Sequence, residues 1–239
     1  MTGTAEVAPG PELPVRAQLA ALVERGMSWD SYHARTPFLR HVGRPAAVLI
    51  LFGVLDSRPA EHGGSVVPAD LDVLLVGRAS TLTHHSGQVA FPGGRLDPDD
   101  AGPVAAALRE AVEETGLDAG GVEVLGTLGE LPVPVSNHLV TPVLAWWATP
   151  SPVGVVDVGE SATVFRAPVA DLLDPDHRRT AVLRRAGLTH RSPAFVVGPH
   201  VVWGFTAIVL NEVFDQLGWT EPWDRRATIA APTPSRTRR

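Results

Sequence analysis

Three glutamates stand close together near the end of a predicted helix, in a pattern that suits cation binding. Residues 104–116, VAAALREAVEETG, are predicted to form this helix, and its apolar stripe is made of Val104, Leu108, Ala111, Val112 and Thr115. Glu110, Glu113 and Glu114 fall on the opposite side at helical spacings that make their carboxylates neighbours. Their mutual repulsion and the helix dipole each disfavour this arrangement by a few tenths of a kcal/mol to about 1 kcal/mol.

A solvated acidic face would account for three such glutamates if they stood alone, but the neighbouring residues favour a bound cation. Hard divalent cations such as Mg²⁺ bind carboxylate oxygens and keep waters that substrate phosphates can replace. Gly93 and Gly94, shortly before the helix, can bring backbone groups close to an ion or a phosphate. Arg109 stands next to Glu110 and can hold one carboxylate through a bidentate contact. These residues therefore predict a metal site that handles phosphate.

The rest of the chain must supply the strands and helices that position this site. Apolar runs predict strands over residues 46–55, 70–80, 88–91, 122–128, 138–148 and 161–169, and a hairpin over 195–204. Helices are predicted over residues 19–25, 104–116 and 205–218, with a short one beginning at 170. Pro103 suits the first turn of the 104–116 helix, and Gly116 suits its C-terminal cap. Strands mixed with two main helices predict an α/β sandwich rather than a regular βαβ array.

Composition limits the class of protein. The chain has 239 residues, a net charge of −6, 44% hydrophobic residues and no cysteine. This length and apolar content suit one large domain, and the acidic balance argues against a nucleic-acid partner. Disulfides and thiolate zinc sites are excluded. Residues 1–14 lack the pattern of a signal peptide, and the apolar run 46–55 is shorter than the roughly 20 residues that span a bilayer. We expect a soluble cytoplasmic protein without a membrane partner.

The segment GGRLDPDDAGPVAAALREAVEETGL, residues 93–117, resembles the Nudix box, whose usual pattern is G-x5-E-x7-R-E-U-x-E-E-x-G-U with U an aliphatic residue. The second half matches at Arg109, Glu110, Ala111, Glu113, Glu114, Gly116 and Leu117. Asp100 stands where glutamate is usual, and eight residues rather than seven separate it from Arg109. The extra residue is expected in the loop before the helix, where insertions are tolerated.

A longer box of this kind, with the residues before it, is similar to the coenzyme A pyrophosphatase branch of the Nudix family. That branch has an upstream signature, L-L-T-x-R-[SA]-x3-R-x3-G-x3-F-P-G-G. The matching residues here are Leu74, Leu75, Arg78, Ala79, Gly87, Phe91, Pro92, Gly93 and Gly94. Val76 replaces the threonine, and Thr83 replaces the second arginine. The change at Thr83 removes a cation that could meet a substrate phosphate.

The resemblance implies an α/β/α sandwich with a mixed sheet, in which the box forms a loop–helix–loop. It implies Mg²⁺ or Mn²⁺ held by Glu113 and Glu114, with Glu110 as a further ligand or as the base, and with the Gly94 carbonyl as a further candidate ligand. Arg109 joins Glu110 and Glu114 as an expected catalytic residue. Arg78, Gly93 and Gly94 are the expected substrate contacts. Glu160 is either an extra acid or base near the metal or an ordinary loop glutamate.

We expect residues 1–34 to form a leader with a short helix, residues 35–220 to form the Nudix hydrolase domain, and residues 221–239 to be a disordered basic tail. The expected reaction is hydrolysis of coenzyme A or its derivatives to phosphopantetheine and adenosine 3′,5′-bisphosphate. The alternatives are a Nudix hydrolase of ADP-ribose, a dinucleotide or a nucleoside triphosphate, and a non-catalytic nucleotide-binding module. The expected partner is a small nucleotide substrate, and a homodimer is the candidate assembly.

Overall fold

The computed structural model describes residues 14–35, 43–54, 60–63, 65–78, 88–157, 161–185 and 187–232. Its helices are α1 (Val15–Arg25), α2 (Asp30–Arg35), α3 (Pro103–Thr115), α4 (Val169–Leu173) and α5 (Phe205–Leu217), with a 3₁₀ turn at Ala119–Gly121. Its strands are β1 (Arg44–Val54), β2 (Leu71–Arg78), β3 (Val89–Ala90), β4 (Gly93–Arg95), β5 (Val122–Thr127), β6 (Leu131–Val133), β7 (His138–Trp147), β8 (Ser161–Pro168), β9 (Arg178–Arg185), β10 (Leu188–Val197), β11 (His200–Val202) and β12 (Thr228–Ala230).

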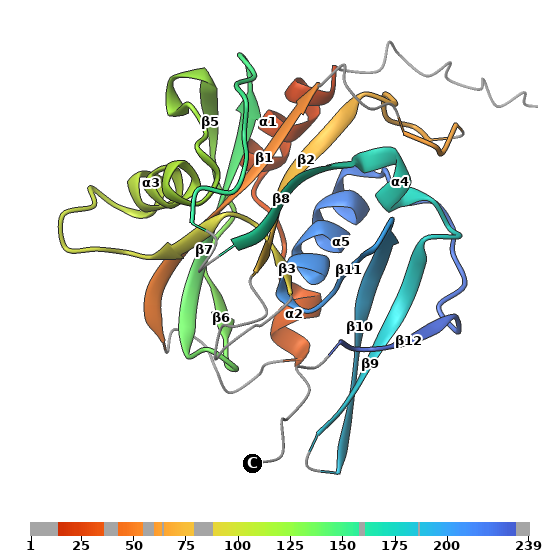
Figure 1. Ribbon diagram of the computed structural model, residues 1–239. Helices are drawn as coiled ribbons and strands as arrows, with labels where there is room; N and C mark the ends of the chain where they lie inside the picture. Colours follow the sequence, from red (N-terminus) through yellow and green to blue (C-terminus); the bar gives the residue numbers. More distant parts are fainter. Residues whose placement is uncertain are drawn as a thin grey trace, which may run out of the picture.

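The larger sheet is mixed and has helices on both faces (Figure 1). Its central path runs β3–β2–β1–β7–β5, with β4 beside β1, β6 beside β7 and β8 beside β2. Strands β1 and β7 are parallel, whereas the other pairs in this sheet are antiparallel. The predicted α/β sandwich with a mixed sheet is therefore confirmed.

Two hydrophobic clusters lie on opposite faces of this sheet. On one face, α3 packs its alanines against Leu49 and Leu51 of β1 and Val143 of β7. On the other face, α1 and α5 pack against Ile50 and Phe52 of β1. Alternating residues of β1 thus enter two different cores, which explains why this strand reads as a continuous apolar run. The central strands hold α3 in a fixed position on the sheet.

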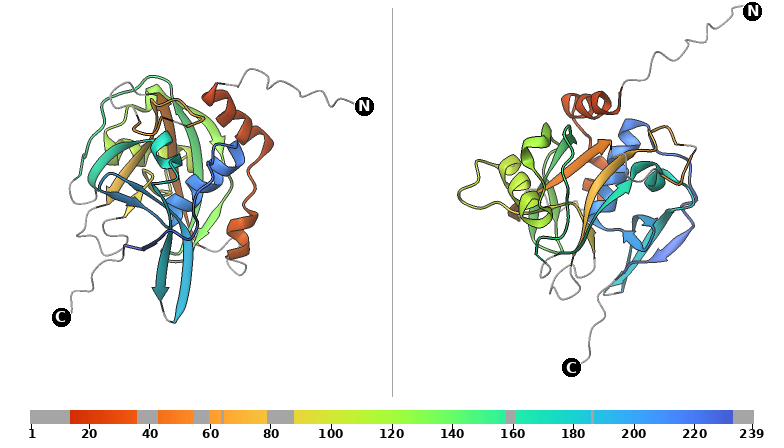
Figure 2. Two further views of the ribbon diagram at one scale, coloured as in Figure 1. Left: turned by 90° about the vertical axis from the view of Figure 1, so that its right-hand side faces the viewer. Right: turned by 45° about the horizontal axis from the view of Figure 1, so that its top comes forward.

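A second sheet of four strands, in the order β11–β10–β9–β12, packs against α5 (Figure 2). The hairpin of β10 and β11 was predicted, but β9 was not. Its sequence, RRTAVLRR, places arginines at both ends of a short apolar core. The structure also differs from the disorder expected for residues 221–239, because β12 pairs in parallel with β9 through Ile229 opposite Ala181.

The N-terminal helices belong to the main core rather than to a separate leader. Leu19 and Leu22 of α1 are fully buried, and Trp29 and Tyr32 add aromatic contacts beside them. Helix α1 begins four residues before the predicted start at residue 19. None of the helices in the described residues combines the length and apolarity that a membrane crossing needs.

Candidate functional site

Helix α3 has the ends that the sequence predicts. Pro103 occupies its first turn after Gly102, and Gly116 closes it in the left-handed conformation with φ of 70°. The predicted apolar stripe is wrong in part, because Val112 is 40% exposed. The buried face consists instead of small residues and one carboxylate: Ala106, Ala107, Ala111, Glu114 and Thr115. Small side chains let the helix lie close to the sheet and turn Glu114 inward.

Glu114 is held by the glycine turn that precedes the helix. Only 5% of this residue is exposed, and the backbone N–H of Gly93 donates to its Oε2 at 3.0 Å. Gly93 lies opposite Val48 of β1 and has φ of 154°. A Cβ at this position would stand 2.4 Å from the carbonyl oxygen of Ala47. Position 93 therefore requires glycine, which aims its N–H at the buried carboxylate.

Glu110 meets the same turn at the next residue. A Cβ built on Gly94 would lie 2.3 Å from Oε1 of Glu110, so the carboxylate occupies the space that any larger residue would need. Gly93 and Gly94 thus lie against two of the three glutamates of α3, Glu114 and Glu110. Glu113 lies farther out, with 58% of its side chain exposed.

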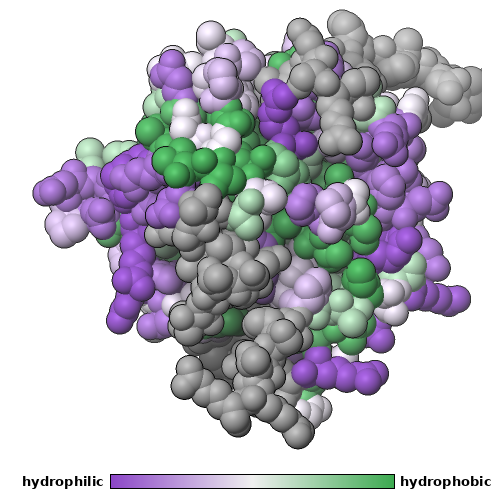
Figure 3. All heavy atoms as spheres, in the orientation of Figure 1, coloured by the Kyte–Doolittle hydropathy of each residue, from purple (hydrophilic) through white to green (hydrophobic). Residues whose placement is uncertain are grey.

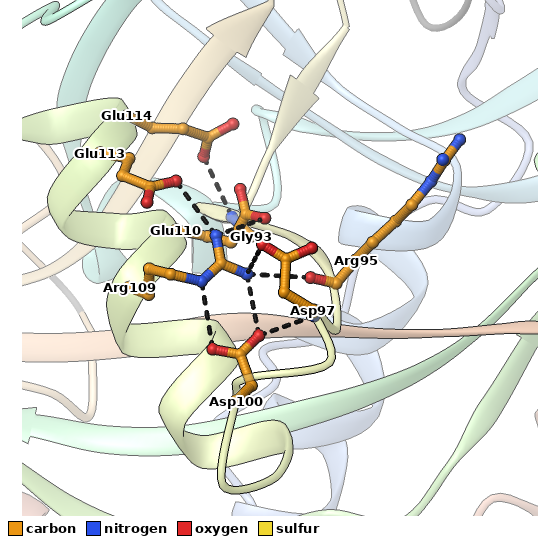
Figure 4. A network of polar contacts seen from close by, with 8 residues as sticks. All are labelled: Gly93, Arg95, Asp97, Asp100, Arg109, Glu110, Glu113 and Glu114. Atoms are coloured by element: carbon orange, nitrogen blue, oxygen red, sulfur yellow. Dashed lines mark hydrogen bonds and ion pairs between the residues drawn. The ribbon is translucent and has the colours of Figure 1, made fainter.

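Arg109 organises the carboxylates around it (Figure 4). Its Nε and Nη2 donate to the two oxygens of Asp100 at 3.1 and 2.9 Å. Its Nη1 donates to Glu110 and to Glu113, both at 3.1 Å, and its Nη2 also donates to the Arg95 carbonyl at 3.1 Å. One guanidinium therefore ties the loop before the helix to two of the three glutamates.

The carboxylate that Arg109 holds through a bidentate contact belongs to Asp100 rather than to the neighbouring Glu110. The side chain of Asp100 also accepts from the Asp97 N–H at 2.8 Å. The side-chain hydrogen bond from Arg109 holds the pKa of Asp100 below its ordinary value. In the sequence, Asp100 stands where the box usually has glutamate, and this position was a signal for its contact with Arg109. The extra residue between Asp100 and Arg109 made the contact harder to predict.

The donor types at this site suit Mg²⁺ or Mn²⁺. Three carboxylates and a glycine carbonyl are hard oxygen donors. However, Glu110 and Glu113 point toward Arg109, and the described residues contain no group of three acidic, histidine or cysteine side chains arranged to hold an ion. A divalent cation would therefore compete with Arg109 for these two carboxylates, while Glu114 stays anchored by Gly93.

Two predicted site residues lie at the limits of the described chain. Arg78 is the last residue of β2, and its Cα partner is Ser161 at the start of β8. Glu160 falls in residues 158–160, outside the described residues, as does the segment 79–87 that carries Thr83 and Gly87. The backbone places Arg78 and Ser161 opposite each other at one end of the β2–β8 pair.

Comparison with known proteins points to one family. The NUDIX domain model matches residues 63–181. An uncharacterised Nudix hydrolase named NudL from Photorhabdus laumondii is 35% identical over 153 residues, which are 61% of this chain and 76% of the relative. NudL from Cronobacter sakazakii is 38% identical over 146 residues, covering 61% and 75%. The crystal structure of a MutT/nudix family protein from Enterococcus faecalis covers 87% of this chain and 76% of its own, with 15% identity and a TM-score of 0.45.

Proposed function

Because the chain belongs to the Nudix hydrolase family, we propose that it hydrolyses the diphosphate linkage of coenzyme A or its derivatives, and that the acidic face of α3 is its active site. Water adds to one phosphorus, the bridging P–O bond breaks, and a proton is released. The products are phosphopantetheine and adenosine 3′,5′-bisphosphate.

The observation that carries this proposal is the contact between the glycine turn and α3. Gly93 donates to Glu114, and Gly94 leaves room for Glu110, so the two halves of the motif form one acidic surface. Arg109 is a single cation paired with Asp100, Glu110 and Glu113, so it offsets only part of the negative charge gathered there. Carboxylates packed this closely still repel one another, which favours a further cation. A hydrolase of a charged diphosphate needs such a cation-binding surface.

The choice of coenzyme A depends on the upstream signature from Leu74 to Gly94. The first departure from that signature is valine instead of threonine at position 76. It does not argue against coenzyme A, because Val76 is fully buried in β2. An aliphatic residue in place of threonine there affects packing rather than substrate contact. The departure at Thr83 keeps ADP-ribose, a dinucleotide or a nucleoside triphosphate as the competing substrates.

We assign a role to each residue of the proposed site. Glu113 and Glu114, with the Gly94 carbonyl, would hold Mg²⁺ or Mn²⁺, which when bound neutralises diphosphate oxygens and acidifies a water. Glu110 is either a third ligand or the group that accepts the proton from the attacking water. Arg109 orients Glu110 and Glu113 through its Nη1. Arg78 would bind a substrate phosphate, and Glu160 is the alternative base.

The test compares the cleavage of coenzyme A, ADP-ribose, a dinucleoside polyphosphate and a nucleoside triphosphate with Mg²⁺ and with Mn²⁺. We expect the highest kcat/KM for coenzyme A, with phosphopantetheine identified by mass spectrometry. Faster cleavage of another diphosphate would replace the proposed substrate while keeping the chemistry. Tight nucleotide binding without any turnover would instead support a non-catalytic module.

A further inference from the structure

A hollow of about 350 Å³ lies between the segment after β7 and strand β8, on the face of the sheet that carries α3. Apolar residues gather on this face between α3 and β8 (Figure 3). The hollow is lined by Ser151, Pro152, Val153, Val164, Phe165 and Arg166. Its volume falls at the lower end of the range for small-molecule sites, so it suits part of a ligand rather than a whole nucleotide.

Both walls of the hollow are connected to the proposed active site. On one side, the N–H of Gly154 donates to the carbonyl of Thr115 at 2.9 Å, which ties the 151–157 segment to the residue after Glu114. On the other side, β8 begins at Ser161 opposite Arg78 and reaches the hollow at Val164. Three residues of extended strand span about 10 Å. A chain leaving a diphosphate near Arg78 would therefore reach the hollow within a short extended length.

The hollow exposes the main chain of β8. Successive residues of a strand point to opposite faces, so Val164, Phe165 and Arg166 can line one hollow together only if it follows the edge of the strand. On its other edge β8 pairs with β2, and no second strand pairs with it among the residues described. An unpaired strand edge offers N–H and C=O groups to an extended ligand that carries amides.

The side chains around the hollow do not suit a nucleobase. The ring of Phe165 is stacked on His200, with centroids 4.2 Å apart and planes 9° from parallel, so one face of this ring is already covered by a protein side chain. The remaining lining side chains offer no aromatic ring. The Arg166 guanidinium interacts with the buried carboxylate of Asp72. Aliphatic contacts from Val153 and Val164 beside main-chain hydrogen-bonding groups favour an uncharged aliphatic chain with amides.

We infer that this hollow binds the pantetheine arm of the substrate, with the edge of β8 pairing with its amides. This inference rests on the proposed function, because it assigns a place to one half of coenzyme A. It makes the 151–153 segment and the edge of β8 the determinants that favour coenzyme A over ADP-ribose, which has a ribose in place of that arm.

The first test measures binding without turnover. We expect 4′-phosphopantetheine, titrated into the metal-free ¹⁵N-labelled protein, to shift the backbone amide signals of Ser151, Val153 and residues 164–166. Adenosine 3′,5′-bisphosphate should leave those signals in place. Pro152 is exposed and lines the hollow, so the tryptophan side chain of Pro152→Trp should fill it and abolish the phosphopantetheine shifts. Val156→Trp should keep these shifts. Val156 is the matched control because it lies on the same segment, is 60% exposed and is outside the lining.

The second test measures specificity. Relative to Val156→Trp, both Pro152→Trp and Val153→Phe should lower the ratio of kcat/KM for coenzyme A to kcat/KM for ADP-ribose by about tenfold, equivalent to ~1.4 kcal/mol. Dephospho-coenzyme A should behave like coenzyme A, since it has the same arm. An unchanged ratio of kcat/KM values would overturn the inference. So would saturating phosphopantetheine that leaves the backbone amide signals of residues 151–153 and 164–166 unshifted. If phosphopantetheine binds in the hollow but the protein cleaves no coenzyme A, the proposed function is refuted and the binding site in the hollow is kept.

Discussion

At the scale of single residues, Glu114 differs from the other two glutamates of the box. It is buried and anchored by the Gly93 N–H, whereas Glu110 and Glu113 share one nitrogen of Arg109. A buried carboxylate with a fixed hydrogen bond has little freedom to reorient, so the fold sets the direction of its carboxylate oxygens. This arrangement makes Glu114 the carboxylate best suited to a constant role, and Glu110 and Glu113 the ones that can change partners when a cation binds.

We expect Glu114→Gln to lower kcat by on the order of 100-fold or more, the size typical of losing one electrostatic contact at a reacting centre. The amide keeps the shape of the side chain, so the melting temperature should stay close to that of the wild type. Steady-state kinetics and thermal unfolding check both statements. Glu24→Gln, an exposed change in the last turn of α1, is the control. Wild-type turnover by Glu114→Gln would remove this residue from the proposed site.

At the scale of secondary structure, the short strand β4 determines whether the site forms. It contains both glycines and pairs with β1 at Ala47 and Val48. Its pairing brings the turn beneath α3, and Arg109 then links α3 back to the Arg95 carbonyl at the end of the same strand. Side chains of α3 therefore hydrogen-bond to the main chain of β4 at both of its ends.

Gly93→Ala should destabilise the protein by about 1–3 kcal/mol, because the added Cβ meets the Ala47 carbonyl in a backbone conformation that alanine adopts with strain. The measurement is the free energy of unfolding in urea. Gly63→Ala serves as the control, since a Cβ there meets nothing within 4 Å. Equal stability of the two variants would show that β4 does not need glycine at this position.

The C-terminal segment, residues 221–232, is ordered against the second sheet, which the sequence did not predict. Trp223 lies over the Arg178 guanidinium, 5.0 Å from its ring centroid, and Phe195 lies at 5.0 Å as well. Arg178 is almost fully buried, and burial lowers its pKa to about 10. The two rings shield a charge that has few hydrogen-bonding partners in the described residues, since only its Nη2 donates, to Asn211.

Trp223→Ala should therefore lower the free energy of unfolding by about 1–2 kcal/mol through the lost cation–π contact, whereas Trp223→Phe should retain most of it. Urea titration of the three proteins provides the comparison. Because β9, which carries Arg178, lies on the far side of α5 from the proposed site, we expect kcat to change little in either variant. A fully stable Trp223→Ala protein would mean that the segment adds nothing to the fold.

At the scale of the whole molecule, two cores share one sheet, and a carboxylate is buried on one of its inner strands. Asp72 of β2 is 2% exposed, and its Oδ1 has no hydrogen-bond partner in the described residues. Burial raises the pKa of Asp72 to about 7, against the opposing effect of Arg166. The folded protein thus binds this proton more tightly than the unfolded chain, whose aspartates have pKa values near 3.8. Stability should fall as the pH rises from about 4 to about 7 and level off above that.

Asp72→Asn removes this titration. The variant should match the wild type near pH 4 and be more stable at pH 8, by up to a few kcal/mol, given that one pKa unit corresponds to about 1.4 kcal/mol. Melting temperatures recorded from pH 4 to pH 8 test this, with the exposed Asp99→Asn as the control. Parallel curves for wild type and Asp72→Asn would contradict the assignment.

The sequence alone determined the elements whose patterns are local. Strands β1, β2, β5, β7 and β8, the ends of α3 and the closing helix α5 follow from apolar runs, Pro103 and the capping glycines. The box motif also identified the family and the position of its glutamates. The homodimer, the cytoplasmic location and the boundaries of the domain remain predictions.

Tertiary structure decided what depends on contacts between distant residues. Spacing placed all three glutamates on one polar side of α3, but the sheet turned Glu114 inward because the adjacent alanines pack there. Only the fold could bring Asp100 to Arg109 and β12 to β9. Short strands rich in arginine, such as β9, have weak local signals and form because neighbouring strands bury their apolar residues, as β10 and β12 do for Ala181. Periodicity reports which side of an element is apolar, whereas the partner that covers that side is set by the whole chain.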